Sequence, residues 1–151
     1  MSFARFLAAG HVTVGSDIVQ RITPAPYWLW READFLDLHA VAQTNIVMNP
    51  PFFRAKGAEA FIRHAFKLAT GKVAAFVDLK FLAGSSRANG LYAEMPPDRV
   101  WMITPRPSCP PGEYLQAGNT AGGGTADWVW LVWDIASPTG ETSFGWLRRD
   151  M

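Results

Sequence analysis

The feature that most constrains the fold is residues 46–53, an apolar run that leads into an asparagine and two adjacent prolines. The apolar residues before Asn49 are typical of a strand in a parallel sheet, since both faces of such a strand are covered. Pro50 and Pro51 restrict φ and offer no N–H, so neither a strand nor a helix can continue through them. We therefore expect the side-chain carbonyl of Asn49 and the main-chain carbonyl of Pro50 at the carboxyl edge of the sheet, where open α/β folds bind ligands.

The residues after the prolines predict a strand–helix–strand unit. Apolar residues recur there at the spacing of one helical face. They are Ala58, Phe61, Ile62, Ala65, Phe66 and Ala69. Gly71 is placed to end this helix, and residues 73–79 form a second apolar strand. A helix that joins two strands in this way implies a right-handed crossover and parallel pairing.

The segments before this unit are shorter and less regular. Residues 11–17 are typical of a strand that ends in a carboxylate, after a short helical pattern at residues 2–9 that Gly10 is placed to cap. Residues 19–33 contain two prolines and no clean period, so we expect a loop with room for a short strand.

The C-terminal part predicts a pair of strands. Residues 84–90 indicate a loop, and a short helix can follow before Pro96. Residues 100–104 form a strand, and residues 127–134 are apolar on both faces, as in a central strand. A long segment rich in proline and glycine separates these strands, and we expect them to form a C-terminal antiparallel hairpin.

The length and composition limit the classes of protein to which this chain can belong. With 151 residues, the chain has the size of one domain that spans residues 1–151. The net charge of +1 excludes neither a small-molecule site nor a nucleic-acid site, although residues 54–87 hold seven lysines and arginines against two acids. Such a balance suits a surface that faces phosphates or a solvated helix face. The single cysteine and scattered histidines have no zinc-ligand spacing. We expect a cytoplasmic protein without membrane contact, because no signal peptide or membrane span is recognisable.

Asn49-Pro50-Pro51-Phe52 carries the strongest functional signal. After an apolar strand, it matches the catalytic (Asp/Asn)-Pro-Pro-aromatic motif of the amino-group DNA methyltransferases, which the chain resembles over most of its length. The resemblance implies an α/β, Rossmann-like sheet with helices on both faces, and S-adenosylmethionine as the cofactor. It also implies DNA as the partner, with an adenine flipped out of the duplex as the methyl acceptor and Phe52 stacked on that base.

Acidic positions upstream are similar to the cofactor-binding residues of this family. Asp17, with Ile18 beside it, corresponds to the acidic residue that binds the ribose hydroxyls. Asp34 and Phe35 resemble the acidic and aromatic pair that holds the cofactor's adenine. An aspartate is also common in turns and helix caps, so the alternative for both is a purely structural role.

The proposed chemistry explains why an amide and prolines are needed. The amino nitrogen of adenine is a poor nucleophile because its lone pair is delocalised into the ring. Two carbonyl acceptors, from the Asn49 side chain and the Pro50 main chain, can bind both amino hydrogens and free that lone pair for attack on the sulfonium methyl group. The catalytic contribution is then orientation and electrostatic stabilisation, without a covalent intermediate.

The chain departs from the family at its start. The family opens with a strand and a glycine-rich turn that cradles the methionine end of the cofactor, and no such segment precedes residues 2–9. In the family's sheet this strand lies centrally, between the strands formed here by residues 11–17 and 46–48. We therefore expect an N-terminally truncated domain whose first central strand is missing, with possible completion by a partner subunit or by self-association across the incomplete sheet.

Three functional hypotheses follow. The chain is an adenine methyltransferase domain, inactive in this form if its first segment is essential. Alternatively, it is a non-catalytic relative that keeps the fold to bind nucleic acid or a partner. As a third hypothesis, it methylates RNA or protein, because the same motif occurs in relatives that act on those acceptors.

Overall fold

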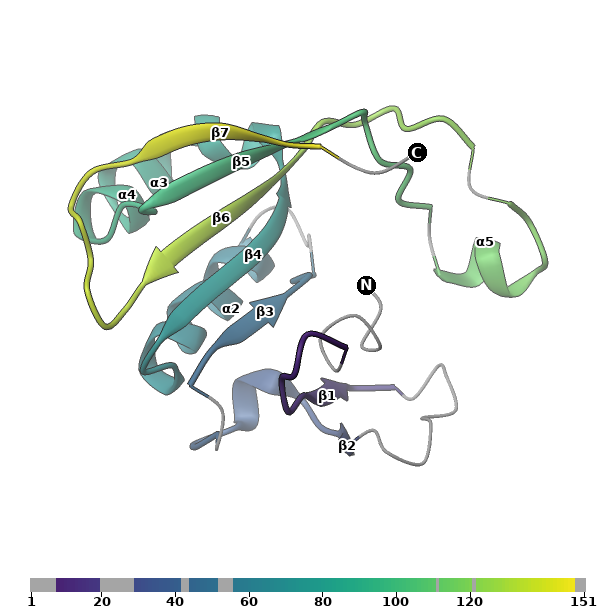
Figure 1. Ribbon diagram of the computed structural model, residues 1–151, viewed down its shortest axis with the longest axis horizontal. Helices are drawn as coiled ribbons and strands as arrows, with labels where there is room; N and C mark the ends of the chain where they lie inside the picture. The colour runs from purple at the N-terminus through teal and green to yellow at the C-terminus, as the bar shows by residue number, and fades with distance from the viewer. Residues whose placement is uncertain are drawn as a thin grey trace.

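The computed structural model describes residues 8–19, 29–41, 44–51, 56–110, 112–120 and 122–148. These residues form a mixed sheet of five strands and a separate parallel sheet of two strands, with helices packed on the larger sheet (Figure 1). The predicted α/β class is confirmed at this level.

The elements follow one another in the order that the sequence predicts, with additions near the C-terminus. In chain order they are β1 (Val14–Asp17), β2 (Leu29–Glu32), η1 (Phe35–Asp37), β3 (Ile46–Met48), α2 (Lys56–Leu68), β4 (Lys72–Asp78), η3 (Leu79–Ala83), α3 (Ser85–Asn89), α4 (Leu91–Glu94), β5 (Arg99–Thr104), α5 (Gly112–Gln116), β6 (Trp128–Asp134) and β7 (Ser143–Arg148).

The larger sheet has the strand order β3-β4-β6-β5-β7. β3 and β4 pair in parallel, and α2 connects them, so the predicted strand–helix–strand unit is confirmed. β6 lies between β4 and β5 and runs antiparallel to both. The prediction of a central strand at residues 127–134, paired antiparallel with the strand at residues 100–104, is therefore also confirmed.

Two predictions for the C-terminal part are wrong. The β5–β6 hairpin is not terminal, because β7 follows it and pairs in parallel with β5. Residues 84–90 are not a simple loop, because α3 occupies five of them. Both elements lack a clear apolar period: β7 is an exposed edge strand with a central Gly145, and α3 is a single short turn without a side-chain cap.

The core lies between α2 and one face of the larger sheet. Alternate residues of β4 and β6 point to this face and are buried, as the period of a strand requires. The fully buried members from α2, β4 and β6 are Ala58, Ile62, Ala65, Val73, Ala75, Val77, Val129 and Leu131. Trp133 joins them and donates its indole N–H to the carbonyl of Met95, 3.0 Å away, which fixes the end of α4 against the sheet.

The helix α2 is also linked to α4 on its outer side. The guanidinium of Arg63 donates to Glu59 on the same helix at 2.9 Å and to Glu94 at 2.6 Å. These two acids raise the pKa of Arg63 further above its ordinary value. The expectation of a solvated, charged face on α2 is confirmed, although its arginine is engaged within the molecule.

The second face of the larger sheet carries a band of aromatic side chains. Phe76 stacks on Trp128 with ring centroids 4.7 Å apart and contacts Trp130 at 5.3 Å. These rings and that of Trp101 are only partly buried. The described helices that pack on the sheet do so on the opposite face, so the expected cover of helices on both faces is absent from the described residues. The helix expected at residues 2–9 lies almost wholly outside them, while Gly10 has φ of 82° in the left-handed region.

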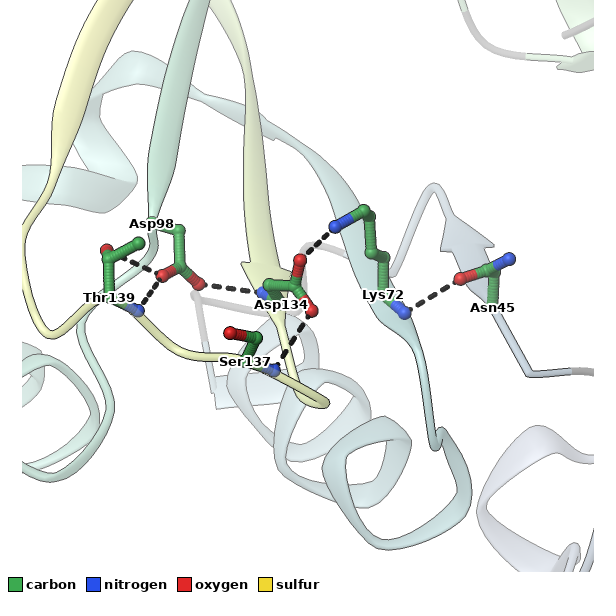
Figure 2. A network of polar contacts seen from close by, with 6 residues as sticks. All are labelled: Asn45, Lys72, Asp98, Asp134, Ser137 and Thr139. Atoms are coloured by element: carbon green, nitrogen blue, oxygen red, sulfur yellow. Dashed lines mark hydrogen bonds and ion pairs between the residues drawn. The ribbon is translucent and has the colours of Figure 1, made fainter.

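A network of polar contacts lies at the end of the larger sheet where β4, β5 and β7 begin and β6 ends (Figure 2). The buried carboxylate of Asp98 accepts hydrogen bonds from the backbone N–H of Asp134 at 2.7 Å and from the N–H and hydroxyl of Thr139. Asp134 in turn pairs with Lys72, whose backbone N–H donates to the side chain of Asn45 at 2.8 Å. This edge is therefore structural.

The smaller sheet is attached to the larger one through η1. β1 and β2 pair in parallel over four residues. Phe35 stacks on Phe61 of α2 with ring centroids 5.3 Å apart, and the ring of His64 meets it edge-on. His64 Nε2 lies 2.9 Å from the carbonyl of Leu38. No helix in the described ranges combines the length and the apolar composition needed to cross a membrane.

Candidate functional site

The candidate site lies at the carboxyl edge of the larger sheet. β3, β4, β5 and β7 all run in one direction, because β3 is parallel to β4, β6 is antiparallel to both β4 and β5, and β7 is parallel to β5. Their carboxyl ends therefore share one edge, opposite the polar network of Figure 2. Asn49 directly follows β3 and lies at this edge, as predicted.

Asn49, Pro50 and Pro51 combine an exposed amide with a fixed backbone. The Asn49 side chain is exposed, and within the described residues no partner for its carboxamide is found. Pro50 is fully buried and Pro51 is half-buried. A buried proline holds the adjacent backbone without an N–H to satisfy. The arrangement presents one amide outward from a rigid turn, while Phe52 and Phe53 lie outside the described residues.

The neighbouring strand ends in a capped turn. The Asp78 carboxylate, at the end of β4, accepts a hydrogen bond from the backbone N–H of Lys80 at 2.8 Å. The backbone N–H of Leu79 donates to the carbonyl of Asp127 at 2.8 Å, so the start of η3 is tied to the residue before β6. Asp78 could not be assigned to this edge from the sequence, because a carboxylate at the end of a strand is common and this one belongs to no motif.

A cavity of about 330 Å³ lies at the same edge, in the segment that joins β5 to β6. Its lining includes Pro107, Cys109, Tyr114, Gly123, Thr125 and Trp128. The base of the segment is closed by an ion pair, with Arg106 Nε 2.7 Å from a carboxylate oxygen of Asp127. A side chain at Gly124 would collide with the carbonyl of Pro107, so glycine is required there. Figure 1 shows this segment, with α5, extending away from the sheet.

Asp17 and Asp34 lie at corresponding ends of the two strands of the smaller sheet. Asp17 ends β1, is half-buried, and accepts from the N–H of Val19 at 3.4 Å, while the following Ile18 is 59% exposed. Asp34 follows β2 by one intervening residue and caps η1, accepting from the N–H of Leu36 at 2.9 Å. The backbone N–H of Ala33 donates to the carbonyl of Asp17 at 3.0 Å, which brings the two acidic positions together.

The Phe35 ring is packed against a helix and does not lie on an open binding surface. The ring is half-buried between Phe61 and His64 of α2, so this face of the ring serves the packing of η1 on the helix. These ring contacts connect the segment that contains Asp34 to the helix that follows Asn49. The three predicted site residues therefore belong to two different sheets. Asp17 and Asp34 lie at the ends of strands of the smaller sheet, and Asn49 follows a strand of the larger sheet.

The two sheets separate at the strands where a central strand is expected to be missing. Among the described strands, β1 pairs only with β2 and β3 pairs only with β4. Each of these two strands therefore has one edge without a described partner strand. In Figure 1 the smaller sheet lies beside the β3 end of the larger sheet.

Three of the seven lysines and arginines in residues 54–87 are engaged within the molecule. Arg63 pairs with two acids, Lys72 pairs with Asp134, and Arg87 is 8% exposed. The Arg87 side chain stacks on the Phe81 ring at 4.3 Å and donates to the Phe81 carbonyl at 2.6 Å. Burial raises the pKa of the neighbouring Tyr92 to about 12. These contacts favour the structural interpretation of the basic residues over the phosphate-binding one.

No three histidine, cysteine, aspartate or glutamate side chains gather closely enough to hold a metal ion within the described part of the chain. No protein-family model and no curated protein matches this sequence. The site is therefore interpreted from its own residues and geometry.

Proposed function

We propose that this chain is a Rossmann-like methyltransferase domain that transfers a methyl group from S-adenosylmethionine to the exocyclic amino group of adenine in DNA. The observation that carries the proposal is the exposed amide of Asn49 on a turn anchored by the buried Pro50, at the carboxyl edge of a parallel strand pair. The proposed DNA substrate implies a cytoplasmic location.

The chemistry of the turn supports this role. Two carbonyl acceptors held in a fixed relation can bind both hydrogens of an amino group, and the restricted φ of two prolines lowers the entropy cost of arranging them. Asn49 is exposed whereas Pro50 is fully buried, so this role requires the Pro50 carbonyl to become accessible when the substrate binds. The Asn49 carboxamide is not occupied by a structural hydrogen bond within the described residues, so it is available to a substrate. Phe52, the next residue of the motif after Pro51, is assigned to stacking on the flipped base.

The acidic positions support a site for the adenosine part of the cofactor. Carboxylates at the ends of two adjacent parallel strands can accept hydrogen bonds from the ribose hydroxyls and the exocyclic amino group of a nucleoside. Asp17 is half-buried and Asp34 is exposed. Ile18 provides an exposed apolar surface beside Asp17. When bound, S-adenosylmethionine supplies the sulfonium methyl group, while the residues of the chain bind and orient the two reactants.

The edges of β1 and β3 that have no partner among the described strands favour a second candidate function. Backbone N–H and C=O groups along a strand edge form a template for another strand. A strand from a partner subunit, from another copy or from an upstream segment could pair with both edges and complete one continuous sheet. In this second candidate the chain contributes the acceptor side of a shared site, or serves as a non-catalytic binding module.

The test combines a titration with a transfer assay. Calorimetric titration with S-adenosylmethionine measures cofactor binding, and radiolabelled methyl transfer to DNA, RNA and protein in competition measures acceptor choice. We expect Asn49→Ala to lower transfer at least about a thousandfold, as removal of a transition-state donor or acceptor does, and to leave cofactor affinity unchanged. Asp17→Ala is expected to weaken cofactor binding alone.

Asn89→Ala is the matched control, because Asn89 is an exposed asparagine at the end of α3. Undiminished transfer by the Asn49→Ala protein would contradict the assigned mechanism. A folded chain that neither binds the cofactor nor transfers methyl groups to any of the three acceptors would support the non-catalytic candidate instead.

A further inference from the structure

The outermost strand of the larger sheet, β7, carries an unusual amount of exposed apolar surface. Phe144, Trp146 and Leu147 are 55%, 66% and 45% exposed, although they are neighbours on one strand of six residues. The rings of Phe144 and Trp146 meet edge to face, with centroids 5.2 Å apart. Exposed aromatic clusters of this kind mark interaction surfaces.

The backbone direction of β7 can be derived from one hydrogen bond. The N–H of Ser143 donates to the carbonyl of Asp98 at 3.0 Å, toward β5. Because backbone groups alternate between the two edges of a strand, the N–H and C=O groups of Phe144 and Trp146 point away from β5. β7 is the last of the described strands in the order of its sheet, so no other described strand lies beside these groups.

The other face of β7 is held firmly in place. Gly145 lies directly against Trp101 of β5, and a Cβ atom at this position would come within 2.5 Å of the indole ring. The register pairs Phe144 with Val100 and Trp146 with Met102, so both exposed rings project from the opposite face to Trp101. The strand therefore offers a fixed row of backbone groups together with two rings on one face.

We propose that β7 is a self-association edge, at which two copies of this chain pair antiparallel about a two-fold axis through Gly145. In this register Phe144 of each copy faces Trp146 of the other, on the same face, and both residues exchange outward backbone hydrogen bonds with their opposite partners. One contact thus covers all four rings and joins the two larger sheets into a single continuous sheet.

The charges along β7 are compatible with a second copy as the partner. In the same register Arg148 of one copy lies opposite the uncharged Thr142 of the other, and both residues are exposed. No like charges therefore face one another beside the aromatic centre, where they would weaken pairing. β7 and β3 lie at opposite edges of the larger sheet, so this contact is independent of the proposed methyl transfer.

The first test is sedimentation of the full chain over about a hundredfold range of concentration. We expect a reversible monomer–dimer equilibrium. The double variant Phe144→Thr/Trp146→Thr removes the rings and retains strong strand-forming residues, so it should fold, as judged by circular dichroism, and sediment as a monomer throughout. Leu115→Thr, on α5, is the control, because Leu115 has a comparable exposure of 47% and should leave the dimer unchanged.

The second test measures the register by disulfide formation in a Cys109→Ser background, which removes the exposed native thiol. Ser143 of one copy faces Leu147 of the other in a non-hydrogen-bonded pair, with Cα atoms about 4.5 Å apart, within disulfide range. Mixing the Ser143→Cys and Leu147→Cys chains should yield a cross-linked heterodimer. Either chain alone should not cross-link, because equivalent Cα atoms lie about 14 Å apart along the strands.

A monomer at every concentration, or a dimer that persists in the double variant, would overturn the proposal. Persistence would place the contact elsewhere, for example across the edges of β1 and β3. Cross-linking of a single-cysteine chain with itself as efficiently as the mixture would contradict the register.

Discussion

Asp98 lies where β5 begins, and its carboxylate reaches the end of β6 and the loop before β7. Burial alone would raise the pKa of this carboxyl group, but hydrogen bonds from the N–H of Asp134 and from the N–H and hydroxyl of Thr139 hold it below its ordinary value of 3.8. The stabilisation that follows is present above the ordinary pKa and is lost as the pH falls through the lower value of the folded state.

We expect Asp98→Asn to destabilise the fold by about 2–3 kcal/mol at neutral pH, because charge-assisted hydrogen bonds are lost and at least one buried N–H is left without an acceptor. Urea unfolding at a series of pH values measures this difference. It should stay constant above about pH 5 and shrink at lower pH, because the unfolded wild-type chain then binds a proton at Asp98 more readily than the folded chain does.

The control for this series is Asp37→Asn, on the exposed surface of η1, which should change stability by less than about 0.5 kcal/mol. A gap between wild type and Asp98→Asn that stays constant down to pH 2 would contradict the assigned role of the carboxylate.

At the scale of single residues, the sequence predicted correctly the positions that depend only on their neighbours in the chain. The turn at Asn49 and Pro50 follows from proline geometry alone, and Asp17 follows from the end of an apolar strand. The packing of Phe35 on Phe61 and His64 could not be predicted, because it joins segments whose spacing in the sequence carries no period. The engagement of Arg63 by Glu94 is a tertiary contact of the same kind.

At the scale of elements, the strongest periods gave the correct assignments. α2 buries one stripe at helical spacing. β6 is apolar on both faces and lies between β4 and β5, as predicted for a central strand, although only one of its faces is fully buried. β7 has no such pattern because it lies at an edge, and its glycine is required by Trp101 rather than by a turn. β3 is also an edge strand but was predicted, because its apolar run and the prolines that follow it mark it in the sequence. An edge strand that has neither signal, such as β7, cannot be recognised from the sequence.

The contribution of α2 to stability can be measured at Ile62, which is fully buried against the sheet. We expect Ile62→Ala to lower the free energy of unfolding by about 2–5 kcal/mol, because it removes buried methyl groups and leaves a cavity. Equilibrium urea unfolding provides the measurement. Lys67→Ala, on the exposed side of the same helix, should change stability by about 0.5 kcal/mol or less, and equal losses in both variants would contradict the assigned core face.

At the scale of the whole molecule, the chain contains two sheets that are stabilised by different amounts of packing. The larger has a helix-covered core, whereas the smaller has two strands of four residues and is attached through η1. The sequence predicted the order of these strands but not where hydrogen bonding between neighbours stops. The boundary between the two sheets depends on which strands pair with one another. Strand pairing joins residues far apart in the sequence, so it cannot be predicted from a short stretch of residues.

We expect this difference to appear in amide hydrogen exchange. An isolated pair of short strands is marginally stable, so amides of β1 and β2 should exchange at least about a hundredfold faster than those of β4 and β6. Exchange followed by mass spectrometry measures both regions in one sample. Equal protection of the two sheets would mean that they unfold as one unit.

The band formed by Phe76, Trp128, Trp130 and Trp101 gives the molecule an optical property of its own. Phe76 contacts the indoles of Trp128 and Trp130, so a change in the geometry of these rings changes the surroundings of both indoles, on which their emission depends. Trp128 also lines the cavity at the carboxyl edge. Events at that edge are therefore connected to the emission and near-ultraviolet dichroism of indoles on the open face of the sheet, so the protein can be followed by its own fluorescence without an attached dye.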